Sequence, residues 1–152
     1  MTERCQLLYL SRLAADRSPA CVADIVRAAR QRNSAHGISS VLVFDGWRFC
    51  QCLEGTAAGV GTLAGRIRAD VRHTDFRVLH QGEAVIPLRL DGKSLVYALD
   101  YDDSLDRFEQ TRGVQAVALL TGMLPTFDLE PAFSSCKMQG LTDSFSVDSY
   151  TR

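Results

Sequence analysis

The sequence predicts an α+β fold of a single domain in which helices cover a sheet. Three observations support this class. The 152 residues are enough for one sizeable core. Short apolar runs typical of strands alternate with stretches whose apolar residues recur at helical spacing. Asp45-Gly46 lies between the apolar runs 38–44 and 47–53, as in a β-hairpin with a two-residue turn.

Residues 6–11 (QLLYLS) predict the first strand. Tyr9 shares one face with Leu7 and Ser11, because side chains alternate along a strand. Both faces are apolar, so we expect this strand at the centre of the sheet, covered on both sides.

The next stretch predicts a helix that begins at Ser18-Pro19 and ends before Gly37. Asn33 lies on its buried stripe, and Arg32 is beside it. A polar residue at this place in the last turn indicates either a C-terminal cap or a contact with a ligand. The residues alone favour the cap.

The hairpin turn predicts three cross-strand pairs on one face: Phe44 with Trp47, Leu42 with Phe49, and Ser40 with Gln51. That face is apolar except near Gln51. A buried amide needs hydrogen-bond partners, because leaving it unpaired costs about 1–3 kcal/mol. Gln51 is therefore a candidate functional residue. Cys50 and Cys52 share the opposite face, where we expect them to be small core residues.

Thr56 opens a second predicted helix. Arg66 and Asp70 lie at the edge of its apolar stripe and are four residues apart, close enough to pair. This is either an ordinary surface ion pair or a means of holding Arg66 toward a ligand carbonyl. Residues 76–80 and 94–99 predict two further strands.

The order of these elements is the ferredoxin-like βαββαββ arrangement. Right-handed crossovers place both helices on one face of the sheet and make the first and third strands neighbours. Tyr9 and Gln51 can then touch, and both can point toward the helices that carry Asn33 and Arg66. Four polar groups from four elements would meet in one interior space, which favours a binding site over plain core packing.

Ser104 predicts the start of a C-terminal helix that ends near Gly113, and residues 114–124 predict another. The second of these is apolar nearly all round. We expect the C-terminal helices to cover the other face of the sheet, or to contribute to a dimer interface. The predicted division is a domain at 1–100, a helical extension packing on the sheet at 101–133, and a polar tail at 134–152.

Composition limits the function classes. Lys and Arg number 17 against 18 Asp and Glu, so we expect no nucleic-acid partner. The apolar run near the N-terminus is too short for a signal peptide or a membrane span, which favours a cytoplasmic protein without a membrane partner. The five cysteines form no CxxC pair, and no metal site is expected. His36, His73 and His80 lack metal-ligand spacing, and we expect surface or capping roles for them.

Tyr9, Asn33, Gln51, Arg66 and Asp70, with the sequences LLYLSR, QRNSAHGIS and FCQCLEG, resemble the BLUF domain. This is the family of blue-light sensors that use flavin. The resemblance runs without a gap from Tyr9 to His73.

The resemblance implies a blue-light photoreceptor that binds a flavin non-covalently between the two helices, with FAD as the usual ligand and FMN or riboflavin as alternatives. It implies that Tyr9 is the electron and proton donor and that Gln51 bridges the tyrosine hydroxyl and the flavin. It further implies a flavin site of four more residues: Asn33 at the C4 carbonyl and N3, Arg66 at the C2 carbonyl, Asp70 as the group that orients Arg66, and Arg32 beside the ring.

Two departures from the family pattern concern the output. Ser39-Ser40 stands where many relatives have Thr-Gly, and Lys93 and Leu95 stand where the fifth strand usually carries a tryptophan and a methionine. The implied output is a changed hydrogen-bond network that signals to a separate partner protein through the region beyond about Ser104. A homo-oligomer is also considered.

Other functions are weighed against this one. The main alternative is a ferredoxin-like regulatory or scaffold module without bound flavin, in which Tyr9 and Gln51 form an ordinary core pair. An acylphosphatase-like enzyme is disfavoured, because the loop RLAADRSPA has no glycine for a phosphate cradle. No nucleophile–base pair, phosphate-binding loop or metal motif indicates an enzyme.

Overall fold

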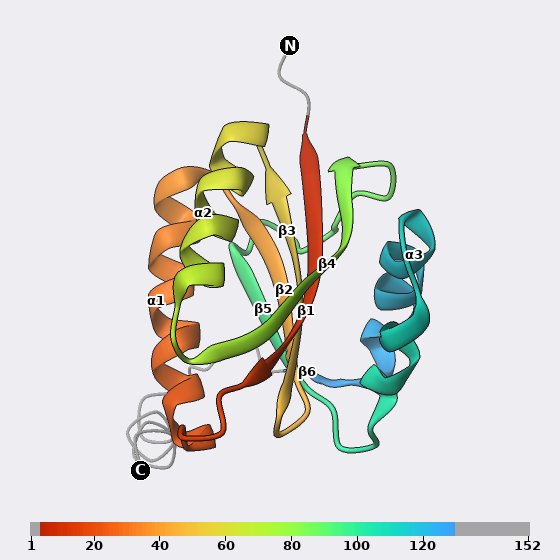
Figure 1. The fold of residues 1–152 in the computed structure, drawn as a ribbon. Helices are drawn as coiled ribbons and strands as arrows, with labels where there is room; N and C mark the ends of the chain where they lie inside the picture. Colours follow the sequence, from red (N-terminus) through yellow and green to blue (C-terminus); the bar gives the residue numbers. More distant parts are fainter. Residues whose placement is uncertain (1–3, 130–152) are drawn as a thin grey trace, which may run out of the picture.

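One sheet separates two groups of helices, with α1 and α2 on one face and α3 on the other (Figure 1). The structure is a computed structural model that describes residues 4–129, and the predicted tail 134–152 lies outside them. The strands and α-helices are β1 (Cys5–Leu13), α1 (Val22–His36), β2 (Ser39–Phe44), β3 (Arg48–Gly55), α2 (Ala57–Ala69), β4 (His73–Glu83), β5 (Leu95–Leu99), α3 (Val114–Met123) and β6 (Asp128–Leu129). Three 3₁₀ helices join them: η1 (Pro19–Cys21), η2 (Ser104–Gln110) and η3 (Leu124–Thr126).

The sheet has the order β4-β1-β3-β2-β5-β6. The predicted ferredoxin-like arrangement and the central place of β1 are confirmed. β1 is antiparallel to β3, with Tyr9 directly opposite Gln51, and β2 runs parallel to β5. The short strand β6, at the edge beside β5, was not predicted. Two residues are too few to show any alternation in a sequence.

The β2–β3 hairpin differs from the predicted two-residue turn. Its register pairs Phe44 with Phe49 and Leu42 with Gln51, so Ser40 lies diagonal to Gln51 rather than opposite it. The predicted pairs were therefore wrong. Because the register moved by an even number of residues, the paired side chains keep their predicted faces.

Asp45 accounts for the longer loop. Its carboxylate accepts the backbone N–H of Trp47 at 3.1 Å and that of Arg48 at 2.7 Å. The N–H of Asp45 donates in turn to the carbonyl of Arg48 at 3.1 Å. Such local side-chain bonds compete with a tight turn. Trp47 consequently leaves the sheet and is 41% exposed, instead of lying on the inner face.

The predicted helix starts at Ser18 and Thr56 and the predicted end before Gly37 are confirmed, although Ser18 caps the 3₁₀ helix η1 and α1 itself begins at Val22. The hydroxyl of Ser18 accepts the N–H of Ala20 at 3.1 Å, and that of Thr56 accepts the N–H of Gly59 at 3.1 Å. Gly37 ends α1 with φ +66°, a left-handed conformation that favours glycine. These ends fix which face of each helix meets the sheet.

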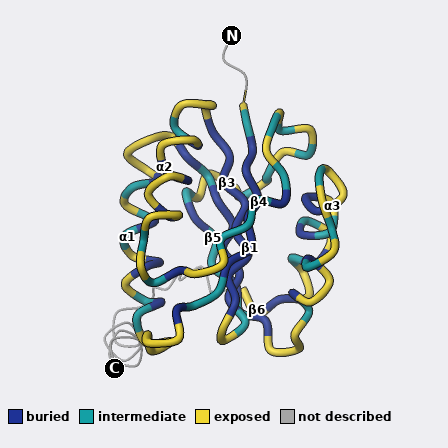
Figure 2. The backbone as a smooth tube through the Cα atoms, in the orientation of Figure 1, coloured by how far each residue is buried: buried dark blue, intermediate teal, exposed yellow. Residues whose placement is uncertain are grey.

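Both faces of the sheet are buried (Figure 2). Under α1 and α2 lies a first core that includes Tyr9. On the opposite face, residues of the C-terminal helices pack over a second core: Leu8, Leu10, Val41, Val43, Cys50 and Cys52 against Leu105, Phe108, Val117, Leu120, Met123 and Phe127. The predicted covering of this face is confirmed. The predicted boundaries at 100 and 133 stay predictions.

The C-terminal region begins differently from the prediction. Ser104 does not cap a helix with its side chain. Instead, the carboxylate of Asp100 accepts the N–H of Asp102 at 3.1 Å and that of Ser104 at 2.7 Å. Asp103 adopts a left-handed conformation with φ +55°, and the chain continues as the 3₁₀ helix η2. The side chain of Asp100, and not that of Ser104, therefore accepts the backbone N–H groups at the start of η2.

A buried cation fastens η2 to the sheet. Arg48 is only 1% exposed and pairs with Asp45 at 2.9 Å, with Asp106 at 2.8 Å and with Glu109 at 3.1 Å. A charge at such a place is tolerated only when it is paired. Burial alone would raise the pKa of Glu109, but hydrogen bonds from Arg77 and Arg48 outweigh it and lower that pKa. Among the described residues, no helix has the length and apolar content to cross a membrane.

The second core can be tested with neighbouring substitutions. Phe108→Ala should lower the free energy of unfolding by about 3–5 kcal/mol, because it removes a fully buried ring. The control Arg107→Ala, at an exposed position, should change it by about 0.5 kcal/mol or less. Urea unfolding followed by circular dichroism measures both. Similar losses in the two variants would contradict the assignment of Phe108 to the core.

Candidate functional site

Tyr9 and Gln51 meet at the centre of the sheet. The hydroxyl of Tyr9 donates to Gln51 Oε1 at 2.6 Å, and both residues are buried. They occupy directly paired positions on β1 and β3 and point to the face covered by α1 and α2. The predicted contact between the two side chains is therefore confirmed.

The network continues through Ser40 and Asn33. Gln51 Nε2 donates to Ser40 Oγ at 3.2 Å. Asn33 Nδ2 donates to the same oxygen at 2.7 Å and to the backbone carbonyl of Ser94 at 2.9 Å. The side chain of Asn33 is thus not a helix cap, and the interpretation that the residues alone favoured was wrong. Its backbone carbonyl serves the cap, since it accepts the N–H of Ile38 at 2.9 Å.

Two buried polar atoms beside this network lack protein partners. They are Asn33 Oδ1 and Arg32 Nε. An unpaired buried acceptor or donor costs about 1–3 kcal/mol, so its persistence needs an explanation. A ligand that donates to Oδ1 and accepts from the guanidinium would supply both bonds.

A groove between α1 and α2 connects the candidate residues. Its inner part is bounded by polar Tyr9, Asn33, Gln51, Asp70 and His73 and by apolar side chains: Ile25, Ala29, Leu42, Leu63 and Ile67. Its outer part is lined by Arg32, His36, Gly59, Thr62, Leu63 and Arg66. Arg32 and Leu63 line both parts, so we treat them as one interhelical groove.

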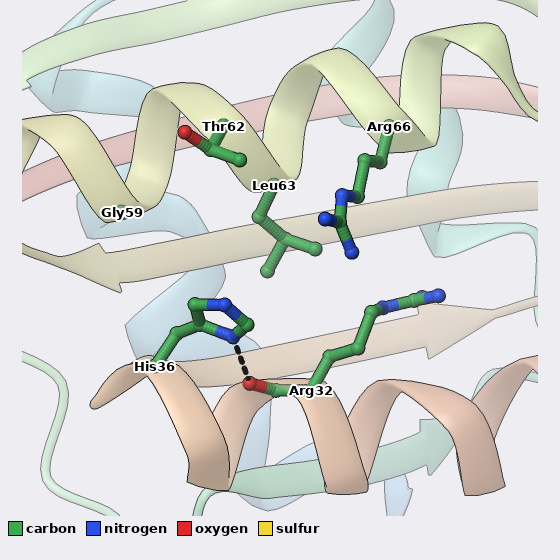
Figure 3. Close-up of a pocket in the computed structure, with 6 residues that line it drawn as sticks. All are labelled: Arg32, His36, Gly59, Thr62, Leu63 and Arg66. Carbon is green, nitrogen blue, oxygen red and sulfur yellow. Dashed lines mark hydrogen bonds between the residues drawn. The ribbon is translucent and has the colours of Figure 1, made fainter.

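Two arginines face each other across the outer part of the groove. Figure 3 shows Arg32 reaching from α1 and Arg66 from α2 into the space between the helices. His36 Nδ1 lies 2.9 Å from the carbonyl of Arg32. Two guanidinium groups side by side repel, and they favour a ligand that offers oxygen atoms to both.

The predicted Arg66–Asp70 ion pair is not formed. Asp70 instead binds Arg72, with Nη2 and Oδ2 2.7 Å apart. The reason is that α2 ends at Ala69 and Asp70 has an extended conformation with ψ 120°, so the helical spacing no longer applies. The hydrogen bond from Arg72 lowers the pKa of Asp70. Asp70 still lines the inner part of the groove.

Comparison with known proteins decides the family. Residues 5–89 match the family model described as "BLUF: Sensors of blue-light using FAD". The chain belongs to the BLUF family. It is 36% identical over 74 residues to the photoactivated adenylate cyclase subunit beta of Euglena gracilis, and 34% identical over 74 residues to that of Euglena longa. The match covers 49% of this chain and only 9% of either relative.

Solved BLUF structures share the fold. The ground state of BlsA aligns with a TM-score of 0.65 at 22% identity, over 91% of this chain and 98% of BlsA. The BLUF domain of BlrP1 aligns with a TM-score of 0.59 at 25% identity, over 98% of this chain and 93% of that domain. Klebsiella pneumoniae BlrP1 with FMN and cyclic diGMP aligns with a TM-score of 0.61 at 26% identity, over 79% of this chain and 35% of the BlrP1 chain.

The BLUF family uses a flavin, and the groove of this chain fits one chemically. A flavin ring carries one N–H donor beside carbonyl acceptors. The unpaired Asn33 Oδ1 can accept from such an N–H, and the unpaired Arg32 Nε can donate to a carbonyl. The apolar walls of the inner groove suit the flat faces of the ring.

The two fifth-strand departures take different places in this BLUF domain. Lys93 is exposed just before β5, and Leu95 is buried in the first core. Leu95 pairs with Ser40 on the parallel strand β2. The position therefore packs beside the Gln51 network, but it carries an aliphatic side chain without a hydrogen-bonding group.

His73 is a site residue that the sequence reasoning missed. It was expected at the surface or as a cap, but it is 8% exposed and lines the groove. Its Nδ1 lies 2.9 Å from Ser11 Oγ, and its ring lies 6.1 Å from that of Tyr9 and 4.7 Å from that of Phe49. β4 contains irregular pairing between Leu10 and Arg12 of β1, and alternation cannot place a residue across such a break.

Burial sets the protonation of the tyrosine and the histidine. Burial, and then the proximity of Cys50 and Asp70, raises the pKa of Tyr9 far above its ordinary value, so the phenol keeps its proton. Burial lowers the pKa of His73, against the opposite influence of Asp70, so the imidazole is neutral at neutral pH. Phe76 stacks on Tyr9 at 4.6 Å and fixes its ring.

A pH series can test the buried histidine. Because the pKa of His73 is lower in the folded chain, the unfolded chain binds more protons as the pH falls below about 6.5. The free energy of unfolding should therefore decrease on going from about pH 7 to pH 5, and His73→Gln should remove part of that decrease. Asp70 and Glu109, whose pKa values are lowered, lose their contributions only at more acidic pH. Equal pH dependence in both proteins would refute a neutral buried His73.

Proposed function

We propose that Tyr9 and Gln51 form the light-driven switch of this flavin-binding blue-light sensor. The observation that carries the proposal is the buried 2.6 Å hydrogen bond from Tyr9 to Gln51 Oε1, which opens onto the interhelical groove. Family membership supports the flavin, with FAD as the ligand in the family description. FMN and riboflavin remain alternatives, because the groove residues proposed here contact only the ring.

The flavin, when bound, supplies blue-light absorption and a strong oxidant. Tyr9 is the group placed to give up an electron and a proton. Its hydroxyl already donates to Gln51 Oε1, so the proton leaves along an existing hydrogen bond. The Gln51 amide has both an acceptor and a donor, and can therefore take the proton and return it. What remains is a rearranged amide and no chemical product.

Four further residues are proposed to hold the ring. Asn33 accepts from the ring N–H through its unpaired Oδ1, and Arg32 and Arg66 donate to ring carbonyls. The groove is narrow, so a bound ring displaces these two arginine side chains to its edge. Asp70 borders the ring and, through its ion pair, holds Arg72 in the loop that follows α2. It does not orient Arg66 in this arrangement.

A module without flavin is not favoured. The unpaired Asn33 Oδ1 and Arg32 Nε beside the groove support a bound ligand over an ordinary core. We also propose that the chain itself is a sensor and not an enzyme. The Euglena relatives named as cyclases are far longer than the matched segment.

The output is proposed to pass to a partner through the C-terminal region. The strands β1 and β3 carry Tyr9 and Gln51 on one face and Leu8, Cys50 and Cys52 on the other. Leu8, Cys50 and Cys52 pack against η2 and α3. A shift of β1 and β3 would therefore displace η2 and α3. Val114, on the outer side of α3, is 40% exposed, and this surface is available to a partner protein or to a second copy of the chain.

Tyr9→Phe tests the switch. The variant should bind flavin and remain yellow, because its ring still packs in the first core, but it should lose the light-induced red shift of the visible band. Absorption spectra before and after blue light measure both. Tyr101→Phe is the matched control, since Tyr101 is exposed and its hydroxyl donates to Asp128 at 2.8 Å, away from the groove. A normal red shift in Tyr9→Phe would show that Tyr9 is not the electron and proton donor of the switch.

Hydrogen exchange tests the output. Blue light should change the deuterium uptake of residues 104–123 in the flavin-loaded protein, because these residues cover the reverse face of β1 and β3. Gln51→Leu should bind flavin and show no such change. Exchange that is the same in light and dark for this segment would show that the signal leaves by another route.

A further inference from the structure

The Gln51 amide lies between two hydroxyl groups. The hydroxyl oxygen of Tyr9 is 2.6 Å from Gln51 Oε1, and Ser40 Oγ is 3.2 Å from Gln51 Nε2. Each hydroxyl can donate or accept, whereas the two ends of the amide differ: one only accepts and the other only donates. The protein can therefore satisfy the Gln51 amide in both of its orientations.

Asn33 is not free to turn in the same way. Its Nδ2 faces the backbone carbonyl of Ser94 at 2.9 Å, and a carbonyl can only accept. This fixes the Asn33 amide, and the second hydrogen of Nδ2 is directed to Ser40 Oγ at 2.7 Å. Ser40 Oγ is thus always an acceptor from Asn33, whatever the orientation of Gln51.

The hydroxyl hydrogen of Ser40 distinguishes the two orientations of Gln51, because it finds an acceptor in only one of them. In the present one, Ser40 Oγ accepts from both Gln51 and Asn33. Its own hydrogen then has no acceptor among the hydrogen bonds of the described residues. If Gln51 turns over, Oε1 faces Ser40 and accepts that hydrogen. The fully buried hydroxyl is then completely satisfied, so Ser40 stabilises the turned amide more than the present one.

We propose that Ser40 is a positioning residue of the light switch, which stabilises the turned orientation of Gln51 and so slows the thermal return to the dark state. The proposal rests on the proposed function above and takes the present orientation as the dark one. Ser40 touches Gln51 and Asn33 and acts through them.

The same serine connects the switch to β5. The carbonyl of Ser94 accepts both from Asn33 Nδ2 and from the backbone N–H of Ser40, at 3.0 Å. When Ser40 exchanges an accepted bond for a donated one, the bond from Asn33 no longer shares its acceptor. Its strength changes, and so does the hydrogen bonding at Ser94. This path does not need a hydrogen-bonding side chain at Leu95.

Ser40→Ala is the test, carried out on the flavin-loaded full chain. The red shift should persist, and dark recovery should be faster by about fivefold or more, because the variant removes the unpaired buried hydrogen that Ser40 carries only in the present orientation. Ser39→Ala is the matched control, because the neighbouring side chain points to the other face and should leave recovery unchanged. Recovery in Ser40→Ala that is unchanged or slower would overturn the proposal.

An infrared measurement separates positioning from mere packing. In protein made with serine isotope-labelled at its carbonyl carbon, the light-minus-dark spectrum should contain a label-sensitive band from Ser94. Ser94→Ala keeps the carbonyl but removes its label, so this band should vanish in Ser94→Ala and in Ser40→Ala. A spectrum without any Ser94 band would overturn the connection to β5. A wild-type protein without a red shift would instead overturn the proposed function.

Discussion

The hydrogen bond between Tyr9 and Gln51 is the constraint on which the site depends. Both side chains are buried at the centre of the sheet, where an unpaired polar group is costly. Each must therefore find a partner in a fixed place. The chain of bonds from Tyr9 through Gln51, Ser40 and Asn33 to the carbonyl of Ser94 meets that need across four elements. The unpaired Asn33 Oδ1 at the end of this chain of bonds supports the proposed place of the flavin.

In the proposed function, one face of the sheet binds the flavin and the other passes on the output. Strands β1 and β3 present Tyr9 and Gln51 to the interhelical groove and Leu8, Leu10, Cys50 and Cys52 to the second core. The buried guanidinium of Arg48 joins the hairpin to η2 through ion pairs, so the C-terminal region is held by charge as well as by packing. A close-packed interior transmits small strand shifts instead of absorbing them. This arrangement gives a hydrogen-bond change in the groove a route to the opposite surface.

Ser40 and His73 show how neighbours adjust a shared chemistry. A hydroxyl on the far side of the Gln51 amide alters the balance between its two orientations without touching the flavin. The imidazole of His73 beside Tyr9 is neutral. If it were protonated, its positive charge would act on the phenol of Tyr9. In the proposed switch, Tyr9 and Gln51 supply the chemistry and Ser40 sets the balance between the two orientations of the Gln51 amide.

The sequence by itself determined the strand and helix order, the helix ends at Ser18, Gly37 and Thr56, and the face on which Tyr9 and Gln51 lie. These follow from local periodicity and capping, which need no distant contact. Only the tertiary structure decided the hairpin register, the pairing of Asp70 with Arg72, the burial of His73 and the double role of Ser40. Each depends on where a chain leaves its regular geometry or on what lies across a strand. Such facts arise when separate elements meet, and no single stretch of sequence carries them.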